Sequence, residues 1–385
     1  MARGRLIVIV LSITALLVRL AFGLAATVRD RKPYLQIAAP TGRVASGGPV
    51  ILPITVINPT RLPLRLNSTS PLQDFDAAPS SKGPDGRIRP SRYGRWMVGS
   101  LMSGGGPSTT TPLVKPQASL NLRAGFPLGR TYDLSMPGRY TVRIVTQRPI
   151  YLVSRKTQIT VRSGMRTIGD HLFLAASGEV APGGAAQSVA KSNKCVLTVV
   201  APYGKLPPSA LEPATRNLLP GPLPPTARLV AKAIPAKGGG MPVLLCVWLY
   251  TGAKPLSLRL TGNPLVDFRP TKVDGPDGRQ GYGLLKTPKP HDGPLPNWKP
   301  VPLTAYGTWL TMHAPTKNLK AKTYSLKPHM VYQYTVPVNL SCRFDMTLPG
   351  NWGGSYHVRL RLAHSKLRTG WISVHVPPPA KHFQP

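Results

Sequence analysis

The sequence contains few acidic residues. Only 13 Asp and Glu stand against 49 Lys and Arg in 385 residues, which gives a formal net charge of +36. Two of the acids are glutamates, Glu179 and Glu212. A glycosidase needs a pair of carboxylic acids that flank the scissile bond, and a calcium site usually gathers several carboxylates among six or more oxygen ligands. The acids of this chain form neither pattern, so we favour structural roles for them.

Cysteine is also scarce, and histidine is scattered. The three cysteines cannot all pair, and they are too few for the disulfide framework of a small secreted domain. If one pair forms, we expect Cys246 with Cys342, because both fall on predicted strands of the same half of the chain. The eight histidines show no metal-ligand spacing, and no Gly-x-Ser-x-Gly sequence supplies a nucleophile. We therefore predict no metal, no cofactor, no catalytic residue and no enzymatic activity.

A helical period is absent beyond residue 26, whereas proline and glycine are abundant, at 45 and 37 residues. Such a composition favours short strands joined by turns. Residues 1–26 differ: Arg3 and Arg5 precede an apolar stretch, Leu6–Val18, and a small-residue exit follows it, which predicts a cleaved secretory signal peptide. The alternative is an uncleaved membrane anchor over the same residues. Either way we expect an exported protein, located in the periplasm, at the cell surface or outside the cell.

One stretch of sequence occurs twice. Residues 133–143 read Asp-Leu-Ser-Met-Pro-Gly-Arg-Tyr-Thr-Val-Arg, and residues 345–350 read Asp-Met-Thr-Leu-Pro-Gly, followed by Tyr-His-Val-Arg at 356–359. Each copy predicts a strand end, a Pro-Gly turn and an alternating strand with Tyr and Val on one face. Other signals recur in the same order, up to strands expected at 158–161 and 372–374 that would close the two copies. This repetition indicates an internal duplication.

The Tyr-x-Val alternation after Pro-Gly resembles the penultimate strand of immunoglobulin-like domains. The pattern of short strands and turns resembles the tandem Ig-like β-sandwich modules of bacterial exported proteins. This resemblance covers most of both copies, and it implies an all-β fold of two antiparallel Ig-like sandwiches. The predicted segments are a signal peptide at 1–26, a first sandwich at 33–163, a Pro-rich connector with one or two docked strands at 164–226, a second sandwich at 227–376 with an insertion at 280–303, and a Pro-rich tail at 377–385.

Six of the acids occupy matched positions in the two copies. In so basic a chain, such acids are expected to have specific partners. Each is interpreted as a turn residue that accepts backbone N–H groups or pairs with a nearby arginine, such as Arg87 or Arg279. The alternative is a calcium site in each copy. The matched pairs are Asp74 with Asp267, Asp85 with Asp277, and Asp133 with Asp345.

Aromatic residues provide the candidates for contact surfaces. Trp96 and Trp309 each follow a glycine by two residues on stretches expected to be strands, so we expect both in the core; the alternative is an exposed platform that stacks on sugars. The insertion of the second copy has no equivalent in the first and is the better candidate for binding. Its candidate residues are Tyr282, Lys286, Lys289, Trp298 and Lys299.

The positive charge attracts polyanions. We therefore predict a non-catalytic structural or binding protein of the cell envelope whose partner is an acidic polymer or an acidic protein. The alternative is a secreted inhibitor that presents a loop to an enzyme, and a basic proteome or an acidic habitat would explain the charge without any partner. The export signal and the low aromatic content argue against nucleic acid as a partner. Contact with a membrane is expected only through an uncleaved N-terminal segment.

Overall fold

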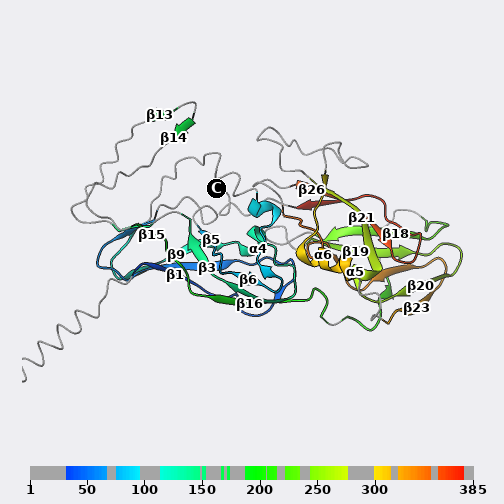
Figure 1. Cartoon of the computed structure of the whole chain (residues 1–385). Coiled ribbons are helices and arrows are strands. Elements are labelled where there is room, and N and C mark those ends of the chain that lie inside the picture. The colour runs from blue at the N-terminus through cyan, green and yellow to red at the C-terminus, as the bar shows by residue number, and fades with distance from the viewer. Residues whose placement is uncertain are drawn as a thin grey trace, which may run out of the picture.

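The computed structural model shows a chain built mainly from antiparallel β-sheets (Figure 1). The predicted all-β class is therefore confirmed. The structure describes residues 32–66, 75–95, 113–147, 150–152, 166–168, 171–173, 187–204, 206–214, 222–234, 243–275, 299–313, 320–347 and 354–376.

The first half of the described chain, residues 32–204, is here called the N-terminal unit. A three-stranded sheet contains, in spatial order, β1 (Tyr34–Ile37), β3 (Leu52–Asn58) and β9 (Ala118–Phe126). A five-stranded sheet contains β2 (Val44–Ala45), β16 (Cys195–Val200), β10 (Gly138–Val142), β6 (Lys82–Gly83) and β7 (Gly86–Arg87). Two smaller sheets have two strands each: β5 (Phe75–Ala77) with β11 (Ile144–Thr146), and β13 (Arg166–Ile168) with β14 (His171–Phe173). A four-stranded sheet contains, in spatial order, β15 (Gln187–Ser188), β12 (Ile150–Leu152), β4 (Leu64–Arg65) and β8 (Leu113–Val114). A short helix, α4 (Leu128–Thr131), follows β9.

Residues 206–376 form the C-terminal unit. One sheet orders β17 (Leu211–Pro213), β24 (Val331–Tyr334), β19 (Leu244–Tyr250) and β18 (Arg228–Ile234), and β25 (Val338–Asn339) also pairs with β19. A second sheet orders β22 (Lys299–Pro300), β21 (Phe268–Gly275), β26 (Gly354–Leu362) and β27 (Ile372–Val376). A third pairs β20 (Leu256–Leu260) with β23 (Lys322–Leu326). The helices are α5 (Pro264–Asp267) and α6 (Ala305–Met312).

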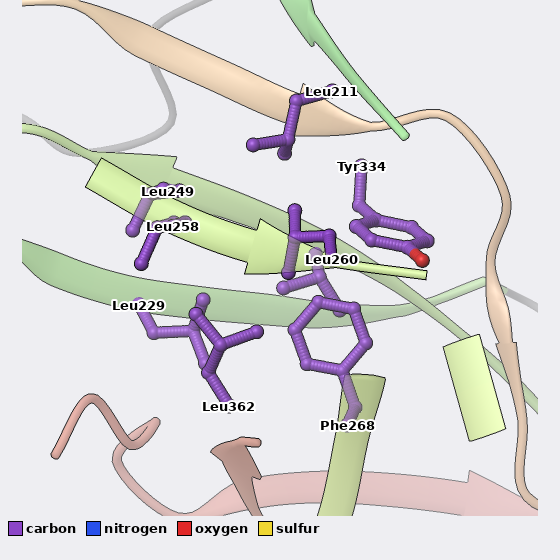
Figure 2. A pocket seen from close by; sticks show the side chains of 9 residues that line it. Leu211, Leu229, Leu249, Leu258, Leu260, Phe268, Tyr334 and Leu362 are labelled. Carbon is purple, nitrogen blue, oxygen red and sulfur yellow. The ribbon is translucent and has the colours of Figure 1, made fainter. Parts of the chain in front are cut away.

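The two units have separate hydrophobic cores. One large cluster of buried apolar side chains lies between Leu35 and Val199 and the other between Ala210 and Val376. Strands such as β27 build the cores by alternation, because successive side chains of a strand point to opposite faces. In the C-terminal core, the rings of Phe268 and Tyr334 pack edge to face, with 4.8 Å between their centres. They lie beside an apolar cavity of about 10 Å³ (Figure 2). A cavity of this size and lining is a packing defect and leaves no room for a ligand.

The predicted connector contributes strands to both units. The strand expected at residues 158–161 lies outside the described part of the chain. Beside β10 lies β16. This strand pairs with β10 as β27 pairs with β26: Tyr140 lies opposite Leu197, and Tyr356 lies opposite Val374. Further on, β17 pairs with β24. The N-terminal core therefore includes residues 195–200, because Cys195, Leu197 and Val199 are buried there.

The Tyr-Gly-Xaa-Trp stretches are helical, which corrects the prediction of strands. In the C-terminal unit the stretch forms α6, and in the N-terminal unit residues 92–95 form a helical turn. Trp309 is 38% exposed on α6, so the expectation that it belongs to the core is wrong; Trp96 lies outside the described residues. The ring of Trp309 instead stacks between those of Tyr306 and His313, which share its side of the helix. The distances between ring centres are 5.8 Å to Tyr306 and 5.3 Å to His313.

The three cysteines are free thiols, so Cys246 and Cys342, the pair favoured in case one pair forms, are not bonded to each other. Cys342 is buried in a small cluster with Leu265 and Leu310. On β19, by contrast, Leu245 and Val247 point into the core, so Cys246 between them points to the other face of the sheet. The parity of the strand thus keeps the Cys246 side chain out of the core.

Candidate functional site at the junction of the two units

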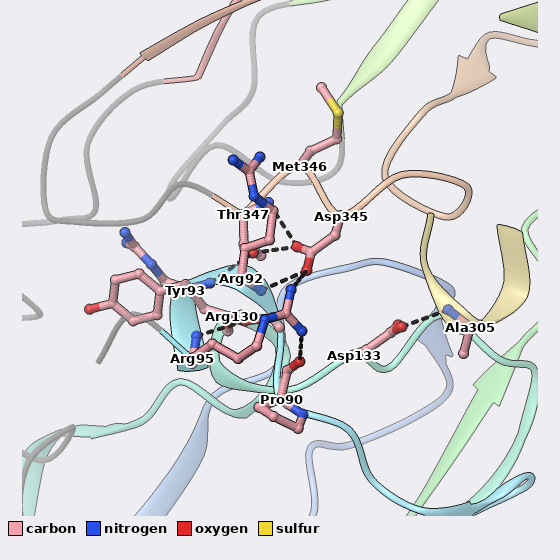
Figure 3. A network of polar contacts seen from close by, with 12 residues as sticks. Pro90, Arg92, Tyr93, Arg95, Arg130, Asp133, Ala305, Asp345, Met346 and Thr347 are labelled. Carbon is pink, nitrogen blue, oxygen red and sulfur yellow. Dashed lines mark hydrogen bonds and ion pairs between the residues drawn. The ribbon is translucent and has the colours of Figure 1, made fainter. Parts of the chain in front are cut away.

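The Asp-x-Ser/Thr parts of the two repeated stretches, residues 133–135 and 345–347, meet at the junction of the units. In each, the aspartate first forms a local turn: Asp133 Oδ1 accepts the N–H of Ser135 at 3.0 Å, and Asp345 Oδ1 accepts the N–H of Thr347 at 3.3 Å. Asp345 Oδ1 also accepts the hydroxyl of Thr347. These bonds orient each carboxylate so that its second oxygen faces the other unit (Figure 3).

The stretch of the N-terminal unit caps helix α6 of the C-terminal unit. Asp133 Oδ2 accepts the N–H of Ala305 at 2.7 Å, and Ser135 Oγ accepts the N–H of Tyr306 at 3.1 Å. The helix also has its own N-cap, Thr304, whose hydroxyl oxygen accepts the N–H of Gly307 at 2.9 Å. The first three N–H groups of α6, which lack partners inside the helix, are thereby all satisfied.

The reverse contact has the same geometry. Asp345 Oδ2 accepts the N–H of Arg92 at 2.6 Å, and Thr347 Oγ1 accepts the N–H of Tyr93 at 3.2 Å. Within the N-terminal unit, Ser91 Oγ accepts the N–H of Gly94 at 3.0 Å, as Thr304 does for Gly307. Each unit therefore supplies one carboxylate and one hydroxyl to the first turn of a helix in the other unit.

Close backbone packing accompanies this exchange. A Cβ atom on Gly94 would lie 2.1 Å from the carbonyl oxygen of Thr131, and one on Gly307 would lie 2.0 Å from that of Arg343. No side chain fits either position, so both helical turns require glycine there. At a third position, Gly47 has φ +67° and packs against the backbone of Ser341 in the other unit, where a Cβ would be 2.7 Å from the carbonyl oxygen.

Burial governs the electrostatics of the junction. It raises the pKa of the Asp345 carboxyl, and nearby Asp133 adds to this effect, while the donors from Thr347 and Arg92 oppose it. The guanidinium of Arg95 lies 3.8 Å from Asp345 Oδ2. Burial also lowers the pKa of Arg130, which sits 3.9 Å above the ring of Tyr93. Charges of both signs are thus held inside a contact that excludes most water.

A cavity of about 20 Å³ lies between the two capping stretches. Its walls include Ser91, Asp133, Thr304 and Asp345. A cavity of this size with polar walls can hold one water molecule. It is too small to hold a substrate, and the hydrogen bonds beside it join the two units.

The other predicted turn acids have different surroundings. Asp267 is buried and accepts the N–H groups of Thr261 and Gly262 and the hydroxyl of Tyr334, which is 2.6 Å away. Asp85 forms an ion pair at 3.2 Å with a nearby arginine, as one of the predicted roles requires; the arginine is Arg89, two residues beyond Arg87. Asp74 and Asp277 lie outside the described residues.

Most of the predicted binding residues also lie outside the described part of the chain. These are Tyr282, Lys286, Lys289 and Trp298; Lys299 begins β22, which pairs with β21 at Gly275. The described segments contain no group of three or more His, Cys, Asp or Glu arranged to hold a metal ion. Nor do they contain a helix long and apolar enough to cross a membrane.

The capping exchange was missed by sequence reasoning. The sequence predicts specific partners for the acids at 133 and 345, but it indicates partners within the same turn or on nearby arginines, whereas the structure also places partners in the other unit. A usable signal was present: a Ser or Thr two residues after each of these aspartates, and a Ser or Thr two residues before each Tyr-Gly. No protein-family model matches this chain, and no curated protein matches its sequence.

Proposed function

We propose that this chain is an exported, non-catalytic binding protein of the cell envelope, made of two Ig-like β-sandwiches that arose by internal duplication and that act as one rigid body. The reciprocal capping of one helix in each unit by the other carries this proposal. Four equivalent hydrogen bonds with equivalent donors and acceptors are the arrangement expected of two copies related by an approximate twofold axis.

The tyrosine that follows each Pro-Gly supports the Ig-like assignment. Tyr140 donates its hydroxyl to the carbonyl oxygen of Met136, and Tyr356 donates to that of Met346, both at 2.9 Å. A buried tyrosine near the start of a strand that bonds to backbone a few residues upstream is a feature of immunoglobulin-type sandwiches, and Tyr140 matches it at four residues, whereas Tyr356 reaches ten residues upstream. Both tyrosines are at most 1% exposed, in the cores of their units.

The charge supports an acidic polymer as the partner. A net charge of +36 on a folded chain produces a positive field that attracts polyanions. A rigid pair of units would hold its basic surface in one fixed arrangement, which lowers the entropy lost on binding an extended chain. The role is therefore that of an anchor or spacer that adheres to acidic envelope material.

Retention of the exported protein on an immobilised acidic polysaccharide, with neutral dextran as the control matrix, tests this function. We expect retention on the acidic matrix alone, released as salt rises, because salt screens exposed charges. Fractionation of the producing cells should place the protein outside the cytoplasm. Absence of retention on any acidic matrix, or a cytoplasmic location, would contradict the proposal.

A further inference from the structure

Arginines gather on the outer face of the sheet that contains β21, β26 and β27. In β26, Tyr356, Val358, Leu360 and Leu362 point into the core, so Arg359 and Arg361 point outward. Arg269 of β21 lies directly opposite Arg361, and Arg368 forms a bridge with Arg361 from its other side. We call Arg269, Arg359, Arg361 and Arg368 the arginine strip.

Like charges placed directly opposite each other repel, because their side chains start only about 5 Å apart. Elsewhere in the described sheets, basic residues mostly face neutral ones: Arg139 faces Thr198, Lys232 faces Cys246 and Arg259 faces Thr323. The hairpin pair of Lys82 and Arg87 is an exception, with Asp85 in its turn. The strip thus concentrates repulsion that the rest of the chain largely avoids.

Acidic neighbours do not neutralise the strip. Among the described residues, none of its four arginines has a carboxylate within ion-pair distance, and Asp274 on the same face pairs with Lys272 at 3.1 Å. The pKa of Arg343 is lowered mainly by the burial of that residue, and the positive charge of Arg269 lowers it further. The four arginines of the strip therefore have no carboxylate partner within the described chain.

The backbone holds two of the guanidinium groups by one nitrogen each. Arg359 Nε donates to the carbonyl oxygen of Thr369 at 3.2 Å, and Arg361 Nε donates to that of Ser365 at 3.1 Å. These bonds orient the groups while leaving their terminal nitrogens for an anion, which a guanidinium can bind through two parallel hydrogen bonds. The strip is preorganised for carboxylate or phosphate groups.

An aromatic ring lies beside the strip. The guanidinium carbon of Arg359 is 5.8 Å from the centre of the Trp371 ring, and Trp371 is partly exposed. Next to it on the same face, β27 exposes Ser373 and His375. An indole ring offers an apolar surface and a hydroxyl offers a hydrogen bond. A sugar ring can use both, whereas a chain of bare phosphates has no apolar face to stack.

We propose that the arginine strip and Trp371 bind a linear acidic polysaccharide, with its carboxylates on the arginines and a sugar ring on the indole. This inference rests on the proposed function and gives it a location. The anion converts the repulsion between the opposed arginines into attraction, which explains why a face with unfavourable cross-strand pairs is useful to the folded protein.

Two matched triple variants of the full chain test the location. R269Q/R361Q/R368Q removes three exposed arginines of the strip, and R43Q/R139Q/R228Q removes three exposed arginines elsewhere, so the net charge falls equally. Binding to polygalacturonate is measured by calorimetric titration at one salt concentration. Each arginine in contact with an anionic surface contributes about fivefold to the affinity. We therefore expect the strip variant, which loses three such contacts, to bind about 100-fold more weakly, and the control variant to lose far less affinity.

The melting temperature supplies a second measurement. If the strip served only to stabilise the fold, removing one of its arginines would lower the melting temperature. R269Q removes one member of the opposed pair, so it should raise the melting temperature while it weakens binding. R139Q, opposite a threonine, should change neither. W371A should weaken binding to polygalacturonate about three- to tenfold but leave binding to polyphosphate unchanged, because only the sugar polymer stacks on the ring.

Each outcome bears on a different statement. Tight binding that both triple variants lose equally would overturn the location but leave the proposed function intact. Binding to polyphosphate or to DNA that exceeds binding to polygalacturonate and ignores Trp371 would overturn the sugar polymer as the partner. No binding to any of the three polymers by the unsubstituted chain would overturn both the inference and the proposed function.

Discussion

At the scale of single residues, the junction depends on side chains that are absent as much as on those that are present. Gly94 and Gly307 lie where a backbone carbonyl of their own unit occupies the space of a Cβ atom. Glycine disfavours a helix interior, so its use one turn into each helix shows that close approach outweighs intrinsic propensity here. Geometry is also decisive for the aspartates at 133 and 345. Their charge alone does not determine what they bind, because the local turn directs each carboxylate to a backbone N–H group of the other unit.

Gly307→Ala should destabilise the protein by about 2 kcal/mol, because the new methyl group must push the backbone of Arg343 away. Gly370→Ala is the control, since a Cβ there meets no atom within 4 Å. Urea denaturation measures both. Equal midpoints for the two variants would show that the junction yields to a methyl group, contrary to the packing described above.

At the scale of elements, the two helices have their first turns satisfied partly by the other unit. A helix of eight residues such as α6 is too short to be stable alone. Its N-cap Thr304 supplies one bond, and the N-terminal unit supplies two more. The formation of the helix and the docking of the units are therefore coupled, since each provides partners that the other needs.

This coupling predicts effects that cross from one unit to the other. Ser135→Ala should speed amide hydrogen exchange at Tyr306 and leave Tyr93 unchanged, whereas Thr347→Ala should speed exchange at Tyr93 and leave Tyr306 unchanged. Loss of a capping oxygen costs about 1 kcal/mol, equivalent to about fivefold in local exchange. Residue-resolved exchange by NMR measures both amides. Effects confined to the unit that carries the substitution would refute the reciprocal exchange.

At the scale of the whole molecule, the question is whether two cores unfold as one. Each unit has its own hydrophobic cluster, and separate cores allow separate unfolding. The junction opposes this, because pulling the units apart would expose N–H groups and carboxylates that have lost their partners. The repulsion within a chain of net charge +36 acts in the opposite direction, so the caps also hold together two strongly like-charged bodies.

We expect a single calorimetric unfolding transition for the unsubstituted chain and two transitions for Asp133→Ala/Asp345→Ala. The double variant removes both carboxylate caps and leaves the cores untouched. Asp85→Ala/Glu212→Ala is the matched control: it also removes two acids, from positions outside the junction, and should keep one transition. A single transition in every variant would show that contacts other than the caps couple the units.

The class of the fold could be predicted from local pattern, because alternation and Pro-Gly turns act between neighbours in the chain. The strand expected at 372–374, for example, lies within β27. The helices at 92–95 and 305–312 could not be predicted so easily. Glycine and aromatic residues are typical of strand or turn there, and the first two N–H groups of each helix find their acceptors more than 170 residues away.

The sequence by itself determined that the chain is basic and β-rich, and it marked the aspartates at 133 and 345 as residues of the same kind, since those properties are local or countable. Only the tertiary structure decided what these aspartates bind, that β16 completes the N-terminal unit, and that Arg269, Arg361 and Arg368 stand side by side. The physical reason is the same in each case. Strand register and docking bring together groups that are distant in the chain, and local pattern carries no information about which of them will meet.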